Sequence, residues 1–149
     1  MIEFTYHGEP VGKGRPRVTA SRGKFAHAYT PKRTKEYEDA IRFEFMASNC
    51  EKMPVYDKDT PLIAIMIFAF AVPKSYSKKK REACLRGEIS HTHRPDTDNL
   101  IKSTLDALVG AAIEEDAAVV KVVAEKIYSE EPYVEVVIDE YKRTERDYR

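Results

Sequence analysis

The residues best suited to chemistry lie together between His93 and Gly110, in the stretch HRPDTDNLIKSTLDALVG. It holds three aspartates and a lysine: Asp96, Asp98, Lys102 and Asp106. A second acidic group, Glu114-Glu115-Asp116, follows directly. Carboxylate oxygens gathered in this way are the ligands that hard divalent cations prefer. The pattern therefore indicates a Mg²⁺ site.

A helix over residues 97–109 would place Asp98, Lys102 and Asp106 on one face, because they are spaced by four residues. Mg²⁺ takes one or two carboxylates, keeps several waters and binds substrate phosphate oxygens. Two such ions about 4 Å apart can activate a water and stabilise the leaving oxygen of a phosphodiester. Lys102 could neutralise the charge that develops on the phosphate. The chemistry indicated is metal-dependent phosphodiester hydrolysis.

Ordinary structural roles are also open for these residues. Asp96 could be a helix N-cap, Asp98 could interact with the helix dipole, and Asp98, Lys102 and Asp106 could form an exposed ladder of ion pairs. An EF-hand calcium loop is excluded, because apolar residues stand where it needs an oxygen ligand, a glycine and a glutamate: Leu100, Ile101 and Ala107.

Basic residues are segregated into two segments. Residues 10–35 contain eight basic residues and no acid, and residues 74–86 contain six basic residues against one Glu. Such segments neutralise DNA phosphates, although a solvated loop and a lysine-rich surface helix are the plain alternatives. We predict DNA contacts by Lys13, Arg15, Arg17, Arg22, Lys24, Lys74, Lys79 and His93. No GxxxxGK[ST] motif is present, so no nucleotide cofactor is expected.

Length and composition indicate one globular domain. The chain has 149 residues, of which 42% are hydrophobic and 34% charged, with a formal net charge of zero. Met1-Ile2-Glu3-Phe4 does not resemble a secretory signal, and the longest apolar run, Leu62 to Val72, is too short to span a bilayer. We expect a cytoplasmic protein with no membrane partner, in which Cys50 and Cys84 are reduced thiols.

Hydrophobic periodicity predicts an α/β (or α+β) fold, a single domain over 1–149 with a mixed sheet of about four strands. Strands are expected at 2–7 and, buried on both faces, at 61–72, with a short one near 25–29. Helices are expected at 32–49, between Ser77 and Gly87, and at 97–109. The runs 118–128 and 133–139 read as an antiparallel hairpin, and 141–149 as a frayed tail.

At the acidic helix the sequence resembles the RusA family of Holliday junction resolvases. The matching residues are Pro95-Asp96-x-Asp98-Asn99-Leu100-x-Lys102, Asp106-Ala107-Leu108 and Asp116-Ala117-x-Val119-Val120. Two N-terminal elements resemble the branch found in Gram-positive bacteria and their phages: Gly12-Lys13-Gly14-Arg15-Pro16-Arg17 and Tyr29-Thr30-Pro31. The similarity covers nearly the whole chain.

The resemblance implies a small homodimeric endonuclease that binds four-way DNA junctions and nicks two strands symmetrically in recombination and repair, using Mg²⁺ or Mn²⁺. It implies catalytic roles for Asp96, Asp98, Lys102 and Asp116, with the three aspartates as metal ligands. Asp106 matches an acidic position, and Glu115 stands where a second aspartate is found. The segment from Leu108 to Asp116 is one residue shorter than in the better-known member, so Glu114 or Glu115 could substitute as a ligand.

Two other functions are open from the residues. A non-catalytic phage accessory protein that binds DNA junctions would keep the basic segments and use the acids structurally. A metal-dependent phosphohydrolase of small molecules would need a closed pocket, which the long basic loop suits poorly.

Overall fold

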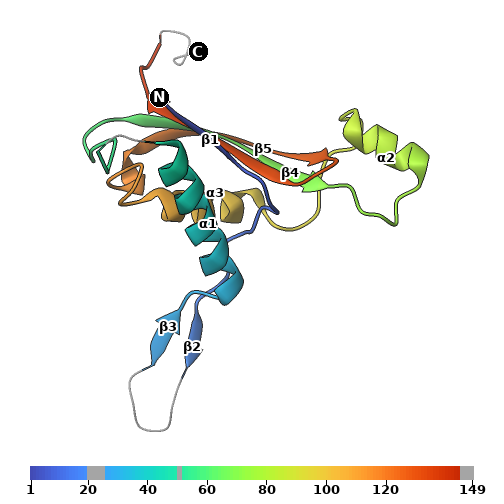
Figure 1. The fold of residues 1–149 in the computed structure, drawn as a ribbon, viewed down its shortest axis with the longest axis horizontal. Coiled ribbons are helices and arrows are strands. Elements are labelled where there is room, and N and C mark those ends of the chain that lie inside the picture. The colour runs from blue at the N-terminus through green and yellow to red at the C-terminus, as the bar shows by residue number, and fades with distance from the viewer. Residues whose placement is uncertain (20–25, 50–51, 145–149) are drawn as a thin grey trace.

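The computed structural model describes residues 1–19, 26–49 and 52–144. They form one α+β domain (Figure 1). The strands are β1 (Ile2–Tyr6), β2 (Arg17–Thr19), β3 (His27–Tyr29), β4 (Leu62–Ala71), β5 (Val119–Ser129) and β6 (Tyr133–Glu140). The helices are α1 (Lys32–Ser48), α2 (Lys78–Leu85), α3 (Thr97–Leu108) and a short 3₁₀ helix, η1 (Asp116–Ala118). No helix among these residues is long and apolar enough to cross a membrane.

The main sheet has the strand order β1-β6-β4-β5. Strand β4 pairs antiparallel with β6 and parallel with β5, while β1 pairs antiparallel with β6. The sheet is therefore mixed and four-stranded, and the predicted fold class is confirmed.

The core lies between one face of this sheet and helices α1 and α3 (Figure 1). Tyr37, Ile41 and Phe45 are the buried stripe of α1, as their spacing predicts. Leu100, Leu105 and Leu108 are the buried side of α3. The two helices are joined inside the core by a hydrogen bond of 2.9 Å between Tyr37 Oη and Thr104 Oγ1. The buried side of α3 thus holds the helix against α1 and the sheet, and its charged side chains are left on the outer side.

The predicted hairpin of the last two strands is wrong. Strands β5 and β6 do not pair with each other, because β4 lies between them and bonds to both. The short connection predicts neighbouring strands. The long apolar strand β4 instead takes the centre, where both of its backbone edges are hydrogen-bonded.

The expected burial of β4 on both faces is also wrong for its first half. Leu62, Ala64 and Met66 face the core, while Ile65 on the other face is 40% exposed. Only Phe68, Ala69 and Phe70 are buried in succession.

Two smaller elements project from the sheet. Strands β2 and β3 form a separate antiparallel ladder, a protruding arm at the end of α1 (Figure 1). The predicted strand near 25–29 is β3, whereas its partner β2 was not foreseen. Helix α2 begins at Ser77, whose Oγ accepts a hydrogen bond from the Lys80 N–H, and is followed by Gly87 at φ 76°, as predicted. The predicted tail begins in coil at 141–144, and its remainder lies outside the described residues.

Candidate active site

Helix α3 carries the acidic motif and is anchored to α1 at its C-terminal end. Asp96 occupies the N-cap position, but its carboxylate makes no cap hydrogen bond. At the other end, Arg42 from α1 donates from Nε to the Ala107 carbonyl (3.1 Å) and from Nη2 to the Val109 carbonyl (2.9 Å). These bonds satisfy carbonyls that the end of a helix leaves free.

The glycine-rich segment after β1 runs along α3. The Lys13 N–H donates to the Asn99 carbonyl (2.8 Å), and Ser103 Oγ donates to the Val11 carbonyl (2.6 Å). A Cβ added at Gly12 would lie 2.9 Å from Pro95 Cβ, so glycine permits this close approach. The segment therefore brings its basic residues to the beginning of the acidic helix.

A carboxylate of α3 is the centre of an ion network. Asp106 Oδ2 lies 3.0 Å from Lys13 Nζ, and Asp106 Oδ1 lies 3.0 Å from Lys102 Nζ. Lys13 also pairs with Glu38 of α1 (2.6 Å), and Lys102 with Asp116 (3.4 Å). Both oxygens of Asp106 are thus engaged, and the network joins the N-terminal segment, α1, α3 and η1.

The network sets the protonation of its members. Burial raises the pKa of Asp106, but the hydrogen bonds and charges of Lys13 and Lys102 outweigh it and hold this pKa below its ordinary value. The hydrogen bond and charge of Asp106, with a smaller contribution from Asp116, raise the pKa of Lys102. Lys102 is therefore a firmly protonated cation in contact with Asp116.

Asp96 and Asp98 are placed differently from Asp106. Within the described part of the chain, neither carboxylate has a hydrogen-bond or ion-pair partner, and both residues are exposed. The expected ladder is therefore only half formed, because Lys102 pairs with Asp106 and not with Asp98. Two adjacent carboxylates at the start of α3 remain available to a ligand.

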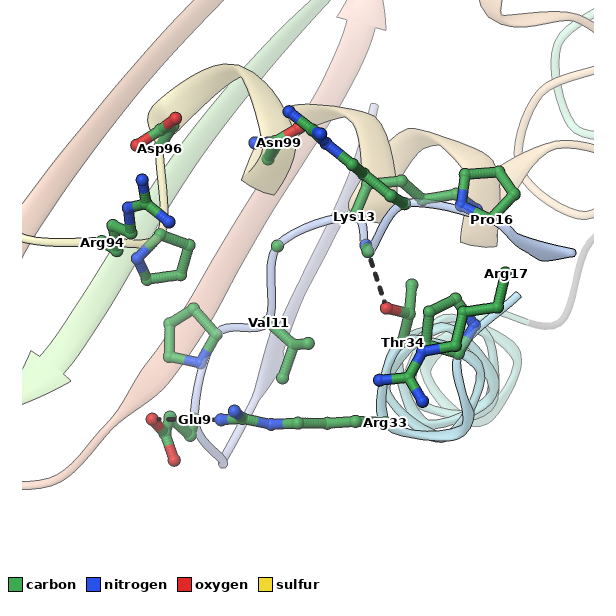
Figure 2. Close-up of a pocket in the computed structure, with 16 residues that line it drawn as sticks. Glu9, Val11, Lys13, Pro16, Arg17, Arg33, Thr34, Arg94, Asp96 and Asn99 are labelled. Carbon is green, nitrogen blue, oxygen red and sulfur yellow. Dashed lines mark hydrogen bonds and ion pairs between the residues drawn. The ribbon is translucent and has the colours of Figure 1, made fainter. Parts of the chain in front are cut away.

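Asp96 borders a basic cleft of about 780 Å³ (Figure 2). Asp98 lies two residues further along the chain and is not among the residues that line the cleft. Asp96, Asn99 and Arg94 lie at one end of it, and Arg17 and Arg33 at the other. Arg33 pairs with Glu9 at 3.4 Å. Among the residues described, Arg15, Arg17 and Arg94 have no acidic partner within ion-pair distance. Their guanidinium groups are available to an anion that enters the cleft.

The predicted DNA-contacting residues fall into three groups. Lys13, Arg15 and Arg17 line the cleft. Lys74 and Lys79 are exposed in and just before α2, at the far end of the sheet, and His93 is exposed in the loop before Asp96. Arg22 and Lys24 lie outside the described residues.

The three residues of the second acidic group, 114–116, have different contacts. Glu114 Oε2 accepts a hydrogen bond of 2.9 Å from the Lys58 N–H and so anchors a neighbouring loop. Glu115 is exposed at the N-cap position of η1, and its carboxylate makes no cap hydrogen bond. Asp116 is the member that reaches the network, through Lys102.

Sequence reasoning missed two cleft residues. Arg33 stands in the counted basic segment but was not assigned to DNA, although it lines the cleft beside Arg17. Arg94 lines the cleft next to Asp96, and its place directly before Pro95-Asp96 was the available signal. The contacts of Lys13 with Glu38 and Asp106 had no signal in the sequence, because they join distant segments.

A family model described as endodeoxyribonuclease RusA matches residues 7–139. The chain belongs to the RusA endodeoxyribonuclease family. The uncharacterized protein YqaN of Bacillus subtilis (strain 168) is 34% identical over 139 residues, which cover 93% of this chain and 96% of the relative. The family match includes the basic cleft, the acidic helix and strands β4 and β5 of the main sheet, so the RusA resemblance of the sequence is confirmed.

A divalent cation needs acidic side chains that lie close together. The residues that the structure describes contain no group of three or more His, Cys, Asp or Glu placed to hold a metal ion. Asp96, Asp98 and Asp116 are thus not gathered into one three-carboxylate cage. The unpartnered oxygens of Asp96 and Asp98 nevertheless fit Mg²⁺, which takes one or two carboxylates and completes its shell with water and phosphate.

Proposed function

We propose that this protein is a Mg²⁺-dependent endonuclease that resolves four-way DNA junctions by paired symmetric nicking, in recombination and repair. The observation that carries the proposal is the placement of Asp96 at one end of a cleft lined by arginines, with Asp98 following in the first turn of α3. Neither carboxylate has a partner among the described residues. A cation held only by carboxylates would not need the basic cleft. A DNA strand supplies both the anionic backbone for the cleft and the phosphate oxygens that complete a Mg²⁺ site.

Each residue of the site has a role in this reaction. Asp96 and Asp98 would hold the cation. Asp116, which pairs with Lys102 at 3.4 Å, would be the third acidic residue of the site. When bound, Mg²⁺ or Mn²⁺ polarises the phosphate and lowers the pKa of a water. Lys102 presents its positive charge to the phosphate oxygens as negative charge develops on them. Asp106 orients Lys102 and Lys13 and acts as a positioning residue.

The cleft residues would bind the backbone of the strand rather than read its bases. Lys13, Arg15 and Arg17 supply charge along the cleft, and Arg94 lies next to the carboxylates. Contacts of this kind position DNA without specifying sequence. They weaken at higher salt, because the counterions that binding displaces from DNA are then released into a more concentrated solution at a smaller gain in free energy. The exposed Lys74 and Lys79, and the arm of β2 and β3, would contact further parts of a branched substrate.

A homodimer would provide the second active site, because a junction has approximate two-fold symmetry. The sheet face opposite α1 and α3 supports this proposal. Ile65 of β4 lies between Val123 of β5 and Val137 of β6, and Ile65 and Val123 are 40% and 49% exposed. An exposed apolar row across three strands is typical of a surface that a partner covers. We place the second copy on this face.

The dimer is tested by Ile65→Lys, with Phe43→Lys on the outer side of α1 as the matched control, since Phe43 is 68% exposed. We expect Ile65→Lys to give a monomer by light scattering and the control to stay dimeric. A dimeric Ile65→Lys protein would place the interface elsewhere.

The nuclease function is tested with a synthetic four-way junction, linear duplex and a forked duplex, each with Mg²⁺ and with EDTA. We expect paired nicks in the junction alone, lost with EDTA. Asp98→Asn should abolish nicking and leave junction binding near wild type, while Asp39→Asn, an exposed carboxylate on α1, should cleave normally. Tight junction binding without nicking by the wild-type protein would show a non-catalytic binding protein instead.

A further inference from the structure

A second cavity lies on the other side of the loop that carries Arg94 and Pro95. It has a volume of about 400 Å³, and we call it the histidine cavity. Its walls are mainly rings: Phe70, Pro73, His91, His93, Tyr128 and Pro132. Arg94 and Pro95 line both this cavity and the basic cleft. A molecule in the histidine cavity would therefore lie next to a ligand bound at Asp96.

The rings of the histidine cavity are stacked around His91. Phe70 and Tyr128 are partners in the parallel pairing of β4 and β5, so their side chains lie side by side at the same end of the sheet. The His91 ring is stacked on Phe70 at a centroid distance of 4.1 Å and an interplanar angle of 18°, and it lies 5.0 Å from Tyr128. His93 approaches His91 edge-on at 6.0 Å. These contacts build a cluster of mutually inclined rings from three parts of the chain.

His91 also offers an unused polar atom. Its Nδ1 is buried and has no hydrogen-bond partner among the described residues. Burial, with a smaller effect from the charge of Lys126, lowers the pKa of His91, so the ring is neutral at pH 7. A buried polar atom without a partner is unfavourable, and a ligand whose binding turns the ring so that Nδ1 meets it would remove that penalty.

The loop between the cavity and the cleft is held in place by Lys126 of β5. Lys126 Nζ donates to the carbonyl of His93 (2.7 Å) and to the carbonyl of Pro95 (2.9 Å). The histidine cavity and the Asp96 carboxylate are therefore fixed relative to each other. A ligand that spans both needs an anionic part for the cleft and a flat part for the cavity.

A nucleotide has both parts. Its base has two flat faces that stack on aromatic rings and a polar edge that can bond to a nitrogen such as His91 Nδ1. A free phosphate would not use the ring-lined walls, and a duplex keeps its bases stacked inside. We propose that the histidine cavity receives one unpaired nucleobase, from the nucleotide next to the phosphate at Asp96 and Asp98. The proposal rests on the proposed nuclease function and adds a reason for selecting branched DNA, where bases at the branch point can unpair.

The test is a binding titration without divalent metal, so that it does not depend on cleavage. The probes are four-way junctions that each carry one abasic site at a different position around the branch point. We expect wild-type protein to bind one of them roughly tenfold more weakly than the intact junction, which is within the range for one stacked base. His91→Ala should bind all of them equally, and His7→Ala, an exposed residue that lines neither cavity, should behave as wild type.

A second variant protects the test against a folding defect of His91→Ala. His91→Phe keeps a ring on Phe70 and removes the nitrogen. With the base at the sensitive position changed in turn, we expect wild-type affinity to vary with the base and His91→Phe affinity to be uniform. Equal wild-type affinities across the abasic series would overturn the base cavity, while junction nicking in Mg²⁺ would leave the nuclease function standing. An unmodified junction that is neither bound nor nicked would overturn the nuclease function itself.

Discussion

Asp106→Asn separates a positioning role for this residue from a role as a metal ligand. The substitution keeps the shape of the side chain and removes the charge that holds Lys13 and Lys102. Asp106 and Lys13 are only 23% and 24% exposed, so we assign their contact about 1–1.5 kcal/mol, as for a hydrogen bond between charged groups near the surface. Lys102 is 56% exposed, so its pair with Asp106 contributes about 0.5 kcal/mol.

The expected loss is therefore about 2 kcal/mol in the free energy of unfolding. For a chain of this size it corresponds to a decrease of roughly 4–8 °C in Tm, measured by circular dichroism at pH 7. Asp39→Asn is the matched control, because Asp39 pairs with Lys35 at 3.5 Å with both side chains about two-thirds exposed. We expect the control to change Tm by about 1–2 °C at most.

The difference in stability between wild type and Asp106→Asn should also shrink at low pH. The pKa of Asp106 is lower in the folded protein than its ordinary value of 3.8, so the folded state binds fewer protons there than the unfolded state. The stabilisation is complete above that ordinary value and is lost as the pH falls through the lower folded pKa. Wild type and Asp106→Asn should therefore differ fully at pH 5–7 and converge below about pH 3.8.

One result would refute this reasoning. If Asp106→Asn keeps the wild-type Tm but loses all junction nicking, the carboxylate acts on the cation or substrate and not on the lysines. The ion network predicts a different result: Asp106→Asn has a lower Tm, and its nicking is slower but not abolished, because Lys102 has lost one of its two partners.

Two further predictions concern packing around the acidic helix. Gly12→Ala places a methyl group 2.9 Å from Pro95 Cβ, so the basic segment must move away from α3; we expect slower junction nicking with the fold retained, and unchanged nicking would contradict the close approach. Thr104→Val leaves the Tyr37 hydroxyl buried without its partner at 2.9 Å, and we expect a loss of about 1–3 kcal/mol in urea unfolding. Adding Tyr37→Phe should recover part of that loss, and a single variant as stable as wild type would show that the hydrogen bond does not matter.

Most of the local elements could be predicted from the sequence, although strand β2 could not. The stripe of Tyr37, Ile41 and Phe45, the cap at Ser77 and the stop at Gly87 were all readable, because helix periodicity and capping depend on residues a few positions apart. The acidic motif residues also resemble those of the RusA family, and the family match confirms that resemblance.

Tertiary structure decided which neighbours those elements have. Residues 118–139 resemble a hairpin, yet β4 separates β5 from β6, because the most apolar strand gains most from a central position with both edges paired. Likewise, the helical spacing suggested Lys102 as the common partner of Asp98 and Asp106. Lys102 pairs with Asp106 as the spacing allows, but folding gives it Asp116 of a distant segment as its second partner, and Asp98 has none among the described residues. Folding also brings Lys13 to Asp106. Local spacing limits which contacts are possible, and the packing of distant segments selects among them.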